Sequence, residues 1–369
     1  MRILFLAVDI DLRNDRGDSV HVRELCANLV AIGHEVVLIT GTPGLDSVDG
    51  AKHLTARATT FGQVRQALGA ARGWADVVYE RRVSPKLSWL VSVFSGTPFA
   101  LEVNGVLEDE RISPGQRVAA PRLKAWIRGL MIRRARRIVT VSRGIRDSLL
   151  DAYRAPPDKV VVIPNGANIV VFTPRNRDSC RSELRLRADD HVLCFVGNLV
   201  GWQGVRTLLD AVAAVARYFS TSTLLIVGDG PERASLEAHA LALGISDSAR
   251  FVGKVPYAEV PRYVCAADVC IAPFQRSRKA SPIKVFEYLA CGVPVVVSNV
   301  DEVGEFVRST KCGLVVEPDD PGALAEAIRW VFDHPAEAAA EGRRGREVVL
   351  RERSWKETAR RVTECLSKA

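Results

Sequence analysis

The sequence predicts an α/β protein built from two tandem, doubly wound domains, each with a parallel sheet covered by helices on both faces. Short apolar runs of strand length alternate with longer segments, and this alternation starts afresh after a polar connector from Thr173 to Asp190. The length of 369 residues is also comfortable for two domains. We expect a ligand to bind beyond the carboxyl ends of the strands, in a cleft between the two facing domains.

The first half of the chain contains six runs typical of buried strands. The first run is followed by a loop rich in Asp, Arg and Gly, and then by a helix that ends at Gly33. In that helix Val20, Leu25, Leu29 and Ile32 are apolar. The predicted strands of this half lie at 2–8, 34–40, 77–80, 99–103, 137–141 and 160–163.

The second half repeats the pattern, with predicted strands at 191–197, 223–228, 249–253, 268–272, 294–298 and 313–316. We place the first domain at 1–172 and the second at 173–353. A final helix at 354–369 begins with Ser354 before Trp355, and we expect it to cross back to the first domain.

One helix in the second half has clear signals at both of its ends. Ser281 can cap its first turn, Pro282 suits the first helical position, and Gly292 can end it in the left-handed conformation. Lys284 and Glu287 lie three positions apart and so share a face. A cation, a carboxylate and a helix N-terminus together suit a ligand with a diphosphate and a diol. The alternative is an exposed helix that carries only an ion pair.

Composition and charge exclude several classes of protein. No apolar run approaches the roughly 18 residues of a membrane span. The eight cysteines form no Cys-x-x-Cys pair, which argues against a zinc site and favours reduced thiols in the cytoplasm. The net charge is +8, and residues 1–165 carry +7 of it because they hold 24 Lys and Arg against 17 Asp and Glu. This imbalance favours an anionic partner, which could be a lipid surface, a nucleic acid or a phosphorylated acceptor.

The segment 122–137 is both basic and apolar. Leu123, Trp126, Ile127 and Leu130 share a helical stripe. The segment is either a helix that packs on the sheet with solvated arginines or a patch that lies on a membrane surface. No nucleic-acid-binding module is recognised, so we expect no nucleic-acid partner.

Two further patterns imitate known binding motifs without matching them. Asp9-x-Asp11 imitates a metal-binding pair of carboxylates, but its position directly after the first strand argues against a metal site. Gly228-x-Gly230 lacks the third glycine and the acidic partner of a dinucleotide fingerprint, which argues against a dehydrogenase.

Several motifs in order resemble those of the family four retaining glycosyltransferases, which use nucleotide sugars and have the GT-B fold of two facing Rossmann-like domains. The resemblance covers nearly the whole chain, and its most specific segment is Phe286-Glu287-Tyr288-Leu289-Ala290-Cys291-Gly292-Val293-Pro294. The other segments are Gly17 to Leu25, Val162 to Gly166, Phe195 to Gly204, Ile226 to Pro231 and Ala267 to Val269.

The resemblance implies a donor-binding role for several of these residues. Glu287 would bind the ribose hydroxyls of the donor, and a carboxylate can accept both hydrogen bonds of a diol. Lys279 stands where the family has a second glutamate, while Asn198 and Gln203 stand where it usually has Arg and Lys. A subset of the family with Ser-Pro-x-Lys-x-Phe-Glu-Tyr and a Trp in the phosphate loop shows similar changes. In that subset the segment Ser281, Pro282, Ile283 and Lys284, together with Trp202, would contact the donor.

Five residues are further candidates for the site. Lys284 would be catalytic, because it can supply the positive charge that Asn198 and Gln203 lack. Asn104 lies roughly where many relatives have a histidine near the reacting sugar, so we take it as a catalytic and acceptor-binding candidate. The other candidates have alternatives: Gly17 in donor binding or as a plain loop glycine, His21 in acceptor binding or packed on the sheet, and Arg206 on the phosphates or solvated on its helix.

The resulting hypothesis is a retaining, metal-independent glycosyltransferase without a cofactor. It would move a sugar from a nucleoside diphosphate sugar to an acceptor hydroxyl, in the synthesis of a cell-surface polysaccharide or glycoconjugate. The acceptor would be a glycan, a lipid-linked glycan or a small molecule, and the enzyme would be cytoplasmic, with peripheral binding to the inner face of the membrane left open. The alternatives are a nucleotide-sugar epimerase on the same fold and a non-catalytic nucleotide-sugar binder.

Overall fold

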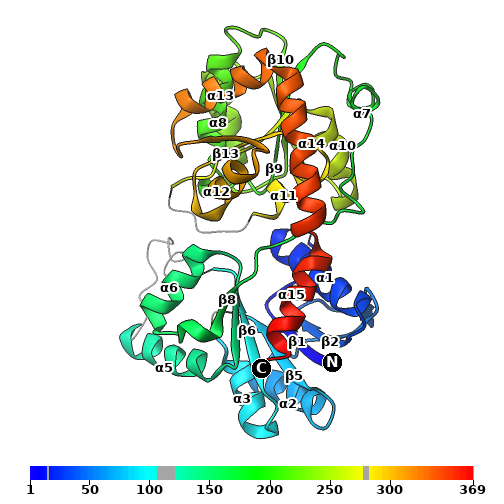
Figure 1. The fold of residues 1–369 in the computed structure, drawn as a ribbon, viewed down its shortest axis with the longest axis vertical. Helices are drawn as coiled ribbons and strands as arrows, with labels where there is room; N and C mark the ends of the chain where they lie inside the picture. The colour runs from blue at the N-terminus through cyan, green and yellow to red at the C-terminus, as the bar shows by residue number, and fades with distance from the viewer. Residues whose placement is uncertain (15, 83, 106–120, 277–281, 369) are drawn as a thin grey trace. The chain divides into compact units, whose positions relative to one another are not determined.

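The computed structural model describes residues 1–368 apart from 15, 83, 106–120 and 277–281. These residues form two compact units, one of the residues up to Asn165 and from Trp355 onward, the other of the residues from Gly166 to Ser354 (Figure 1). The first unit ends earlier than the expected boundary at 172. The reason is that Phe172 packs into the core of the second unit, where the Ala167 N–H also donates to the Arg353 carbonyl.

The first unit is built on an eight-stranded sheet in the order β3-β4-β2-β1-β5-β6-β7-β8. All neighbours are parallel except β3 and β4, which form a short antiparallel pair. The order reverses between β1 and β5, so this sheet is doubly wound. Its strands are β1 (Arg2–Ala7), β2 (Glu35–Thr40), β3 (Ser47–Val48), β4 (Ala51–Thr55), β5 (Val77–Arg81), β6 (Phe99–Val103), β7 (Arg137–Thr140) and β8 (Val160–Val162).

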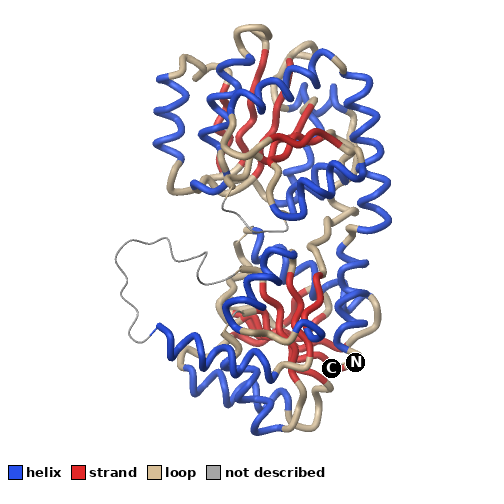
Figure 2. Tube along the Cα trace, turned by 60° about the vertical axis from the view of Figure 1, so that its left-hand side comes forward, coloured by secondary structure: helices blue, strands red, loops and turns tan. Residues whose placement is uncertain are grey.

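Helices cover this sheet on both faces (Figure 2). The helix α15 (Trp355–Leu366) is one of these covering helices, because it packs against α1 (Gly17–Ala31). Side-chain caps fix two of the helix starts: Thr59 accepts the Gly62 N–H and Ser142 accepts the Ile145 N–H. The helices are α1 (Gly17–Ala31), α2 (Thr60–Ala71), α3 (Lys86–Ser95), α5 (Pro121–Arg134), α6 (Arg143–Tyr153), the 3₁₀ turn η1 (Pro157–Lys159) and α15 (Trp355–Leu366).

The second unit contains a six-stranded, all-parallel sheet in the order β11-β10-β9-β12-β13-β14. The order reverses between β9 and β12, which makes their carboxyl ends the expected place for a ligand. The strands are β9 (His191–Val196), β10 (Ser222–Val227), β11 (Ala249–Gly253), β12 (Val269–Ala272), β13 (Val295–Ser298) and β14 (Gly313–Val316).

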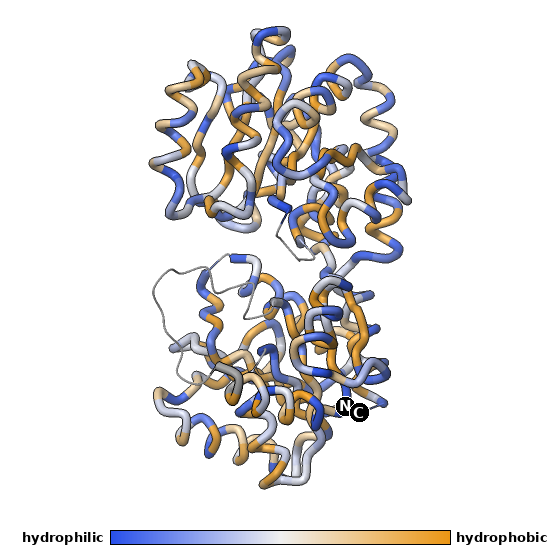
Figure 3. Tube along the Cα trace, turned by 90° about the vertical axis from the view of Figure 1, so that its left-hand side faces the viewer, coloured by the Kyte–Doolittle hydropathy of each residue, from blue (hydrophilic) through white to orange (hydrophobic). Residues whose placement is uncertain are grey.

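The core of the second unit lies on both faces of this sheet. Val192 and Cys194 point to one apolar cluster and Leu193 and Phe195 to the other, as the alternation of side chains along a strand requires. In Figure 3 hydrophobic residues follow the strands of each unit. The covering helices are α7 (Arg177–Glu183), α8 (Val205–Val215), α9 (Arg233–Ala242), α10 (Val260–Ala266), α11 (Ile283–Ala290), α12 (Asp301–Thr310), α13 (Pro321–Asp333) and α14 (Pro335–Glu352), with the 3₁₀ turns η2 (Gly201–Gln203) and η3 (Tyr257–Glu259).

The structure confirms the predicted α/β class with two doubly wound domains, and each predicted strand is present with ends that differ by at most one residue. The pair β3 and β4 was missed, because its strands are short and carry polar residues. Within the described ranges, every helix is too short or too polar to cross a membrane.

Candidate active site

Residues 197–204 of the second unit form a loop that connects β9 to α8, at the point where the strand order reverses. We call it the phosphate-type loop. Its backbone is fixed to the next loop, since the N–H groups of Gly197 and Leu199 donate to the carbonyls of Val227 and Asp229. Gly228 has φ +134°, and a Cβ there would lie 2.0 Å from the Gly197 carbonyl oxygen. Only glycine therefore allows these two loops to pack so closely.

Helix α11 points its first turn at the same loop. The helix starts at Ile283, so Pro282 is the residue before it rather than its first residue, and the proline backbone is extended there. The expected cap, Ser281, lies outside the described residues. The Tyr288 hydroxyl accepts the Val196 N–H at 2.7 Å and ties α11 to the end of β9. Gly292 ends the helix region with φ +76°, which confirms its predicted left-handed conformation.

Lys284 extends from α11 into the phosphate-type loop. Its Nζ donates to Gln203 Oε1 at 2.6 Å and lies 4.1 Å from the centroid of the Phe195 ring. An added Cβ on Gly197 would come within 2.7 Å of the same Nζ. Burial lowers the pKa of Lys284 to about 7, although the negative charge of Glu287 acts in the opposite direction. A bound anion would therefore favour the charged ammonium.

Glu287 lies one turn further along α11 and is buried, with 6% of its surface exposed. Its Oε1 accepts a hydrogen bond of 2.5 Å from the Tyr257 hydroxyl, which belongs to η3. Nothing in the sequence around Tyr257 indicated this contact, because the two residues lie 30 positions apart.

The remaining donor candidates lie at different places around this loop. Trp202 stacks on Phe274 with ring centroids 6.2 Å apart, and its carbonyl accepts the Gln275 N–H. Asn198 is partly buried in the loop itself. Arg206 hydrogen-bonds to His239, whose other ring nitrogen contacts Asp210 at 2.7 Å. The structure thus brings Gln203, Lys284 and Glu287 together, while Arg206 belongs to a separate cluster between α8 and α9.

In the first unit, His21 lies inside the domain and is only 3% exposed. Its Nε2 is 2.5 Å from Glu102 Oε1, and its Nδ1 is 2.8 Å from Asn165 Oδ1. The ring also meets Trp355 of α15 edge-on. Burial alone would raise the pKa of Glu102, but the charges of His21 and Arg81 bring it to about 2. His21 is therefore packed inside the domain against the side chain of Glu102.

Sequence reasoning did not single out Glu102, although a carboxylate inside an apolar strand is a usable signal. Its Oε2 also accepts a 2.6 Å hydrogen bond from Tyr79. Asn104 follows the same strand, and its buried Oδ1 has no hydrogen-bond partner among the described residues. Gly17 is the first residue of α1, where an added Cβ would meet no atom within 4 Å.

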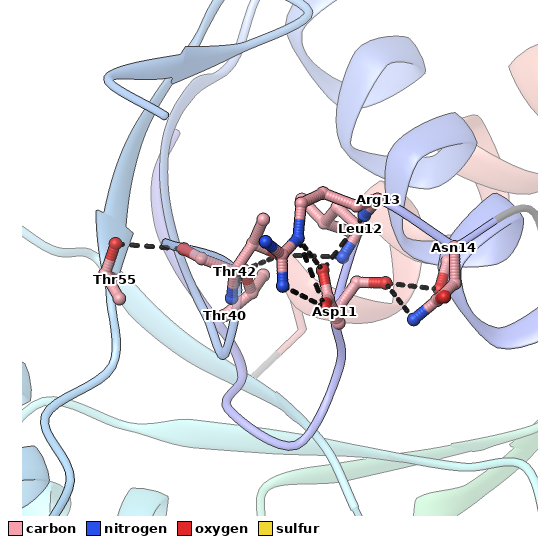
Figure 4. A network of polar contacts seen from close by, with 8 residues as sticks. Asp11, Leu12, Arg13, Asn14, Thr40, Thr42 and Thr55 are labelled. Carbon is pink, nitrogen blue, oxygen red and sulfur yellow. Dashed lines mark hydrogen bonds and ion pairs between the residues drawn. The ribbon is translucent and has the colours of Figure 1, made fainter. Parts of the chain in front are cut away.

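The loop after β1 uses its two carboxylates in ion pairs with arginines. Asp9 is 2.8 Å from Arg82, and Asp11 is 2.6 Å from Arg13. Figure 4 shows Asp11 and Arg13 beside Thr42, whose hydroxyl accepts the Leu12 N–H. In the described ranges of the chain, no three His, Cys, Asp or Glu side chains are grouped so that they could hold a metal ion.

Comparison with known proteins identifies the class to which this fold and this site belong. Residues 16–171 match the family model described as Glycosyltransferase Family 4, and residues 176–348 match the model described as Glycosyl transferases group 1. The chain therefore belongs to the group 1 and family 4 glycosyltransferases with the GT-B fold.

Individual relatives agree with this assignment. The chain is 27% identical to a D-inositol 3-phosphate glycosyltransferase of Thermobispora bispora over 96% of this chain and 90% of the relative. It is 25% identical to a glycogen synthase of Mycobacterium tuberculosis over 97% and 92% of the two chains. Among solved structures, Anabaena HepE in complex with UDP-glucose has a TM-score of 0.83 at 18% identity, with 100% of both chains covered.

Proposed function

We propose that this glycosyltransferase moves a sugar from a nucleoside diphosphate sugar to an acceptor hydroxyl with retention of the anomeric configuration and without a metal ion. The observation that carries the proposal is the contact between Lys284 Nζ and Gln203 Oε1 at 2.6 Å. The family that the sequence resembles usually has a lysine at the position of Gln203. Here an ammonium from α11 reaches the same spot from another element.

The chemistry expected of this site follows from charge. When the sugar leaves its donor, negative charge builds up on the diphosphate, and a cation that faces it stabilises the transition state. Lys284 and the first N–H groups of α11 both favour an anion at this place. Glu287, one turn further on, offers a carboxylate for the ribose hydroxyls.

The names of similar proteins support a nucleotide-sugar donor. HepE of Anabaena has been solved with UDP and with UDP-glucose, and other relatives are named for glycosyl transfer to inositol phosphate or for glycogen synthesis. UDP-glucose is therefore the first donor to test on this chain. We also propose that the product serves a cell-surface polysaccharide or glycoconjugate.

The experiment combines a binding panel with a transfer assay. A thermal-shift panel of nucleotides and nucleotide sugars identifies the donor, because a ligand that binds the folded state raises the unfolding temperature. The selected donor is then incubated with EDTA, with and without acceptors, and the anomeric configuration of the product is determined by NMR. We expect product only with acceptor and with the donor's configuration. Conversion of the donor without an acceptor would indicate an epimerase. A thermal shift without any conversion would indicate a non-catalytic nucleotide-sugar binder.

We further propose that α5 docks on an anionic membrane surface that holds the acceptor. The stripe predicted from the sequence is exposed: 55% of Leu123, 60% of Trp126, 42% of Ile127 and 40% of Leu130 is accessible. The helix packs on its domain through another face, which includes Met131 and Ile132. Arg134 and Arg136 are exposed beside the end of the helix, so apolar and cationic groups occur together as on peripheral membrane helices.

A further inference from the structure

A tyrosine from another element contacts the carboxylate on α11. Tyr257 belongs to η3, and its hydroxyl donates to Glu287 Oε1 at 2.5 Å. Other contacts hold the tyrosine as well: its ring packs on Phe172 with ring centroids 5.2 Å apart, and its carbonyl accepts the Val260 N–H. Tyr257 therefore offers the carboxylate a hydrogen-bond donor whose position the second unit fixes by itself.

Glu287 has a second possible partner in Lys284, which carries the opposite charge three positions earlier on α11. Side chains at this spacing on a helix lie close enough to form an ion pair. The negative charge of Glu287 also acts on the ammonium, since it opposes the effect of burial on the pKa of Lys284. The ammonium nevertheless donates to Gln203 Oε1 at 2.6 Å, and the carboxylate accepts the Tyr257 hydroxyl. Each charge is thus oriented by a neutral group from another element.

Neutral partners orient the two charges without cancelling them. A hydroxyl and an amide carry no net charge, so the ammonium can still attract a diphosphate and the carboxylate can still accept hydrogen bonds from a diol. An ion pair between Lys284 and Glu287 would direct the two groups at each other. A ligand would then have to separate them before it could use either, and this would cost affinity.

We propose that Tyr257 is a positioning residue of the donor site: its hydroxyl keeps the Glu287 carboxylate turned toward the ribose hydroxyls and away from Lys284. This inference rests on the donor-binding roles proposed above for Lys284 and Glu287, and it adds a residue that acts through the carboxylate. Loss of the hydroxyl removes the group that competes with the ammonium for the carboxylate. In Tyr257→Phe the carboxylate should therefore turn to Lys284 and stabilise the charged ammonium.

The first test needs no ligand and follows the ammonium itself. In the folded full-length protein with ¹³C-labelled lysine, the Cε signal of Lys284 is assigned with Lys284→Arg and titrated by NMR. Burial lowers the pKa of Lys284 to about 7. We expect Tyr257→Phe to raise this midpoint by about one pH unit, because a nearby carboxylate favours the charged form. An unchanged or a lower midpoint would overturn the proposal.

A buried tyrosine of the same core serves as the matched control. Tyr263→Phe removes a hydroxyl from α10, where the ring faces the Arg262 guanidinium at 5.4 Å, and it should leave the Lys284 midpoint unchanged. Tyr257→Phe should also have no effect on the midpoint when Glu287→Gln is already present, because the hydroxyl acts through the carboxylate. An equal shift with and without Glu287→Gln would show a general loosening of the fold and would contradict a positioning role.

The second test measures the consequence for ligand binding. UDP, 2′-deoxy-UDP and 3′-deoxy-UDP are titrated by calorimetry against the unaltered protein and Tyr257→Phe. We expect the preference for UDP over the analogue that lacks the hydroxyl bound by Glu287 to fall by at least about threefold in the variant. An unchanged preference would refute the positioning role. If UDP does not bind the unaltered protein, the proposed UDP-sugar donor is wrong, while the Lys284 titration still decides the role of Tyr257.

Discussion

The ammonium of Lys284 lies 2.6 Å from the side-chain oxygen of Gln203, although the two residues are 81 positions apart. The phosphate-type loop after β9 contributes a neutral amide, and α11 contributes the charge. Because Tyr288 fixes α11 to Val196, the position of that charge depends on the packing of two neighbouring elements.

Replacement of Lys284 by alanine should lower turnover on the order of a hundredfold or more while it changes the donor KM less. The cation is needed most when the diphosphate leaves, so its loss falls mainly on the transition state. Lys284→Arg should restore only part of the rate, because a guanidinium has a different shape. Arg206→Ala is the matched control and should stay near the rate of the unaltered enzyme, since Arg206 contacts His239. Steady-state kinetics of the three variants tests the assignment. Near-normal turnover of Lys284→Ala together with lost turnover of Arg206→Ala would show that Arg206 is the phosphate ligand instead.

Affinity for the donor should fall as the pH rises above about 7. Burial lowers the pKa of Lys284 to about 7 in the free protein, so the ammonium that an anion prefers is lost in this range. We expect the donor Kd to rise by up to tenfold for each pH unit above the pKa, which isothermal titration calorimetry between pH 6 and about 9 can measure. Lys284→Met should bind the donor without this pH dependence. If the donor Kd of Lys284→Met still rises with pH, another titrating group causes the pH dependence.

Substitution of Glu287 by glutamine should weaken donor binding by roughly 1–3 kcal/mol, because charged hydrogen bonds to the diol are lost. The carboxylate already accepts a hydrogen bond from Tyr257, so Tyr257→Phe tests whether the effect is one of positioning. We expect the tyrosine variant to lose less affinity than the glutamine variant. Donor affinities from thermal shift or calorimetry, measured on variants with unchanged unfolding temperature, provide the comparison. Unaltered affinity in a folded Glu287→Gln protein would refute the ribose assignment.

Stability should respond to the buried carboxyl group of Glu80. Burial raises its pKa from 4.5 to about 7, although Ser88 donates two hydrogen bonds to it. The folded state therefore holds the proton more tightly than the unfolded state, and stability is lost as pH rises from 4.5 through 7. The loss amounts to roughly 3 kcal/mol. Chemical denaturation at several pH values should show a flatter profile for Glu80→Gln than for the unaltered protein.

The exposed stripe on α5 should determine binding to lipid vesicles. Leu123→Ser and Trp126→Ser should each weaken binding to anionic vesicles by about tenfold at low salt, through lost burial of apolar surface. Leu241→Ser is the control, since Leu241 is 71% exposed but lies on α9 in the second unit. Sedimentation with vesicles of anionic and of neutral lipid, at low and high salt, measures the effect. Equal binding to both lipids would count against the electrostatic part of the proposal.

The sequence predicted most reliably the elements whose signals are local. Long apolar runs marked every core strand, and Gly292 marked the end of the key helix. The start of that helix was misjudged by one residue, because Pro282 is compatible with the position before a helix as well as with its first position.

Contacts between residues that are distant in sequence could not be derived in this way. The pairing of His21 with Glu102 joins α1 to β6, and that of Tyr257 with Glu287 joins η3 to α11. The stripe on α5 was visible in the sequence, but whether it faces the domain or the solvent depends on tertiary packing. Periodicity identifies an apolar face and does not identify its partner.

The return of the last helix to the first unit has a consequence for synthesis of the chain. Trp355 packs on His21, His34 hydrogen-bonds to Thr363, and Arg361 donates to the Val162 carbonyl. The first unit thus lacks this helix until residues 355–366 have been synthesised, even though its sheet emerges from the ribosome earlier. During that interval the face of α1 that α15 will cover stays uncovered and is exposed to aggregation. Premature termination before Trp355 would leave the second unit intact and the first one unfinished.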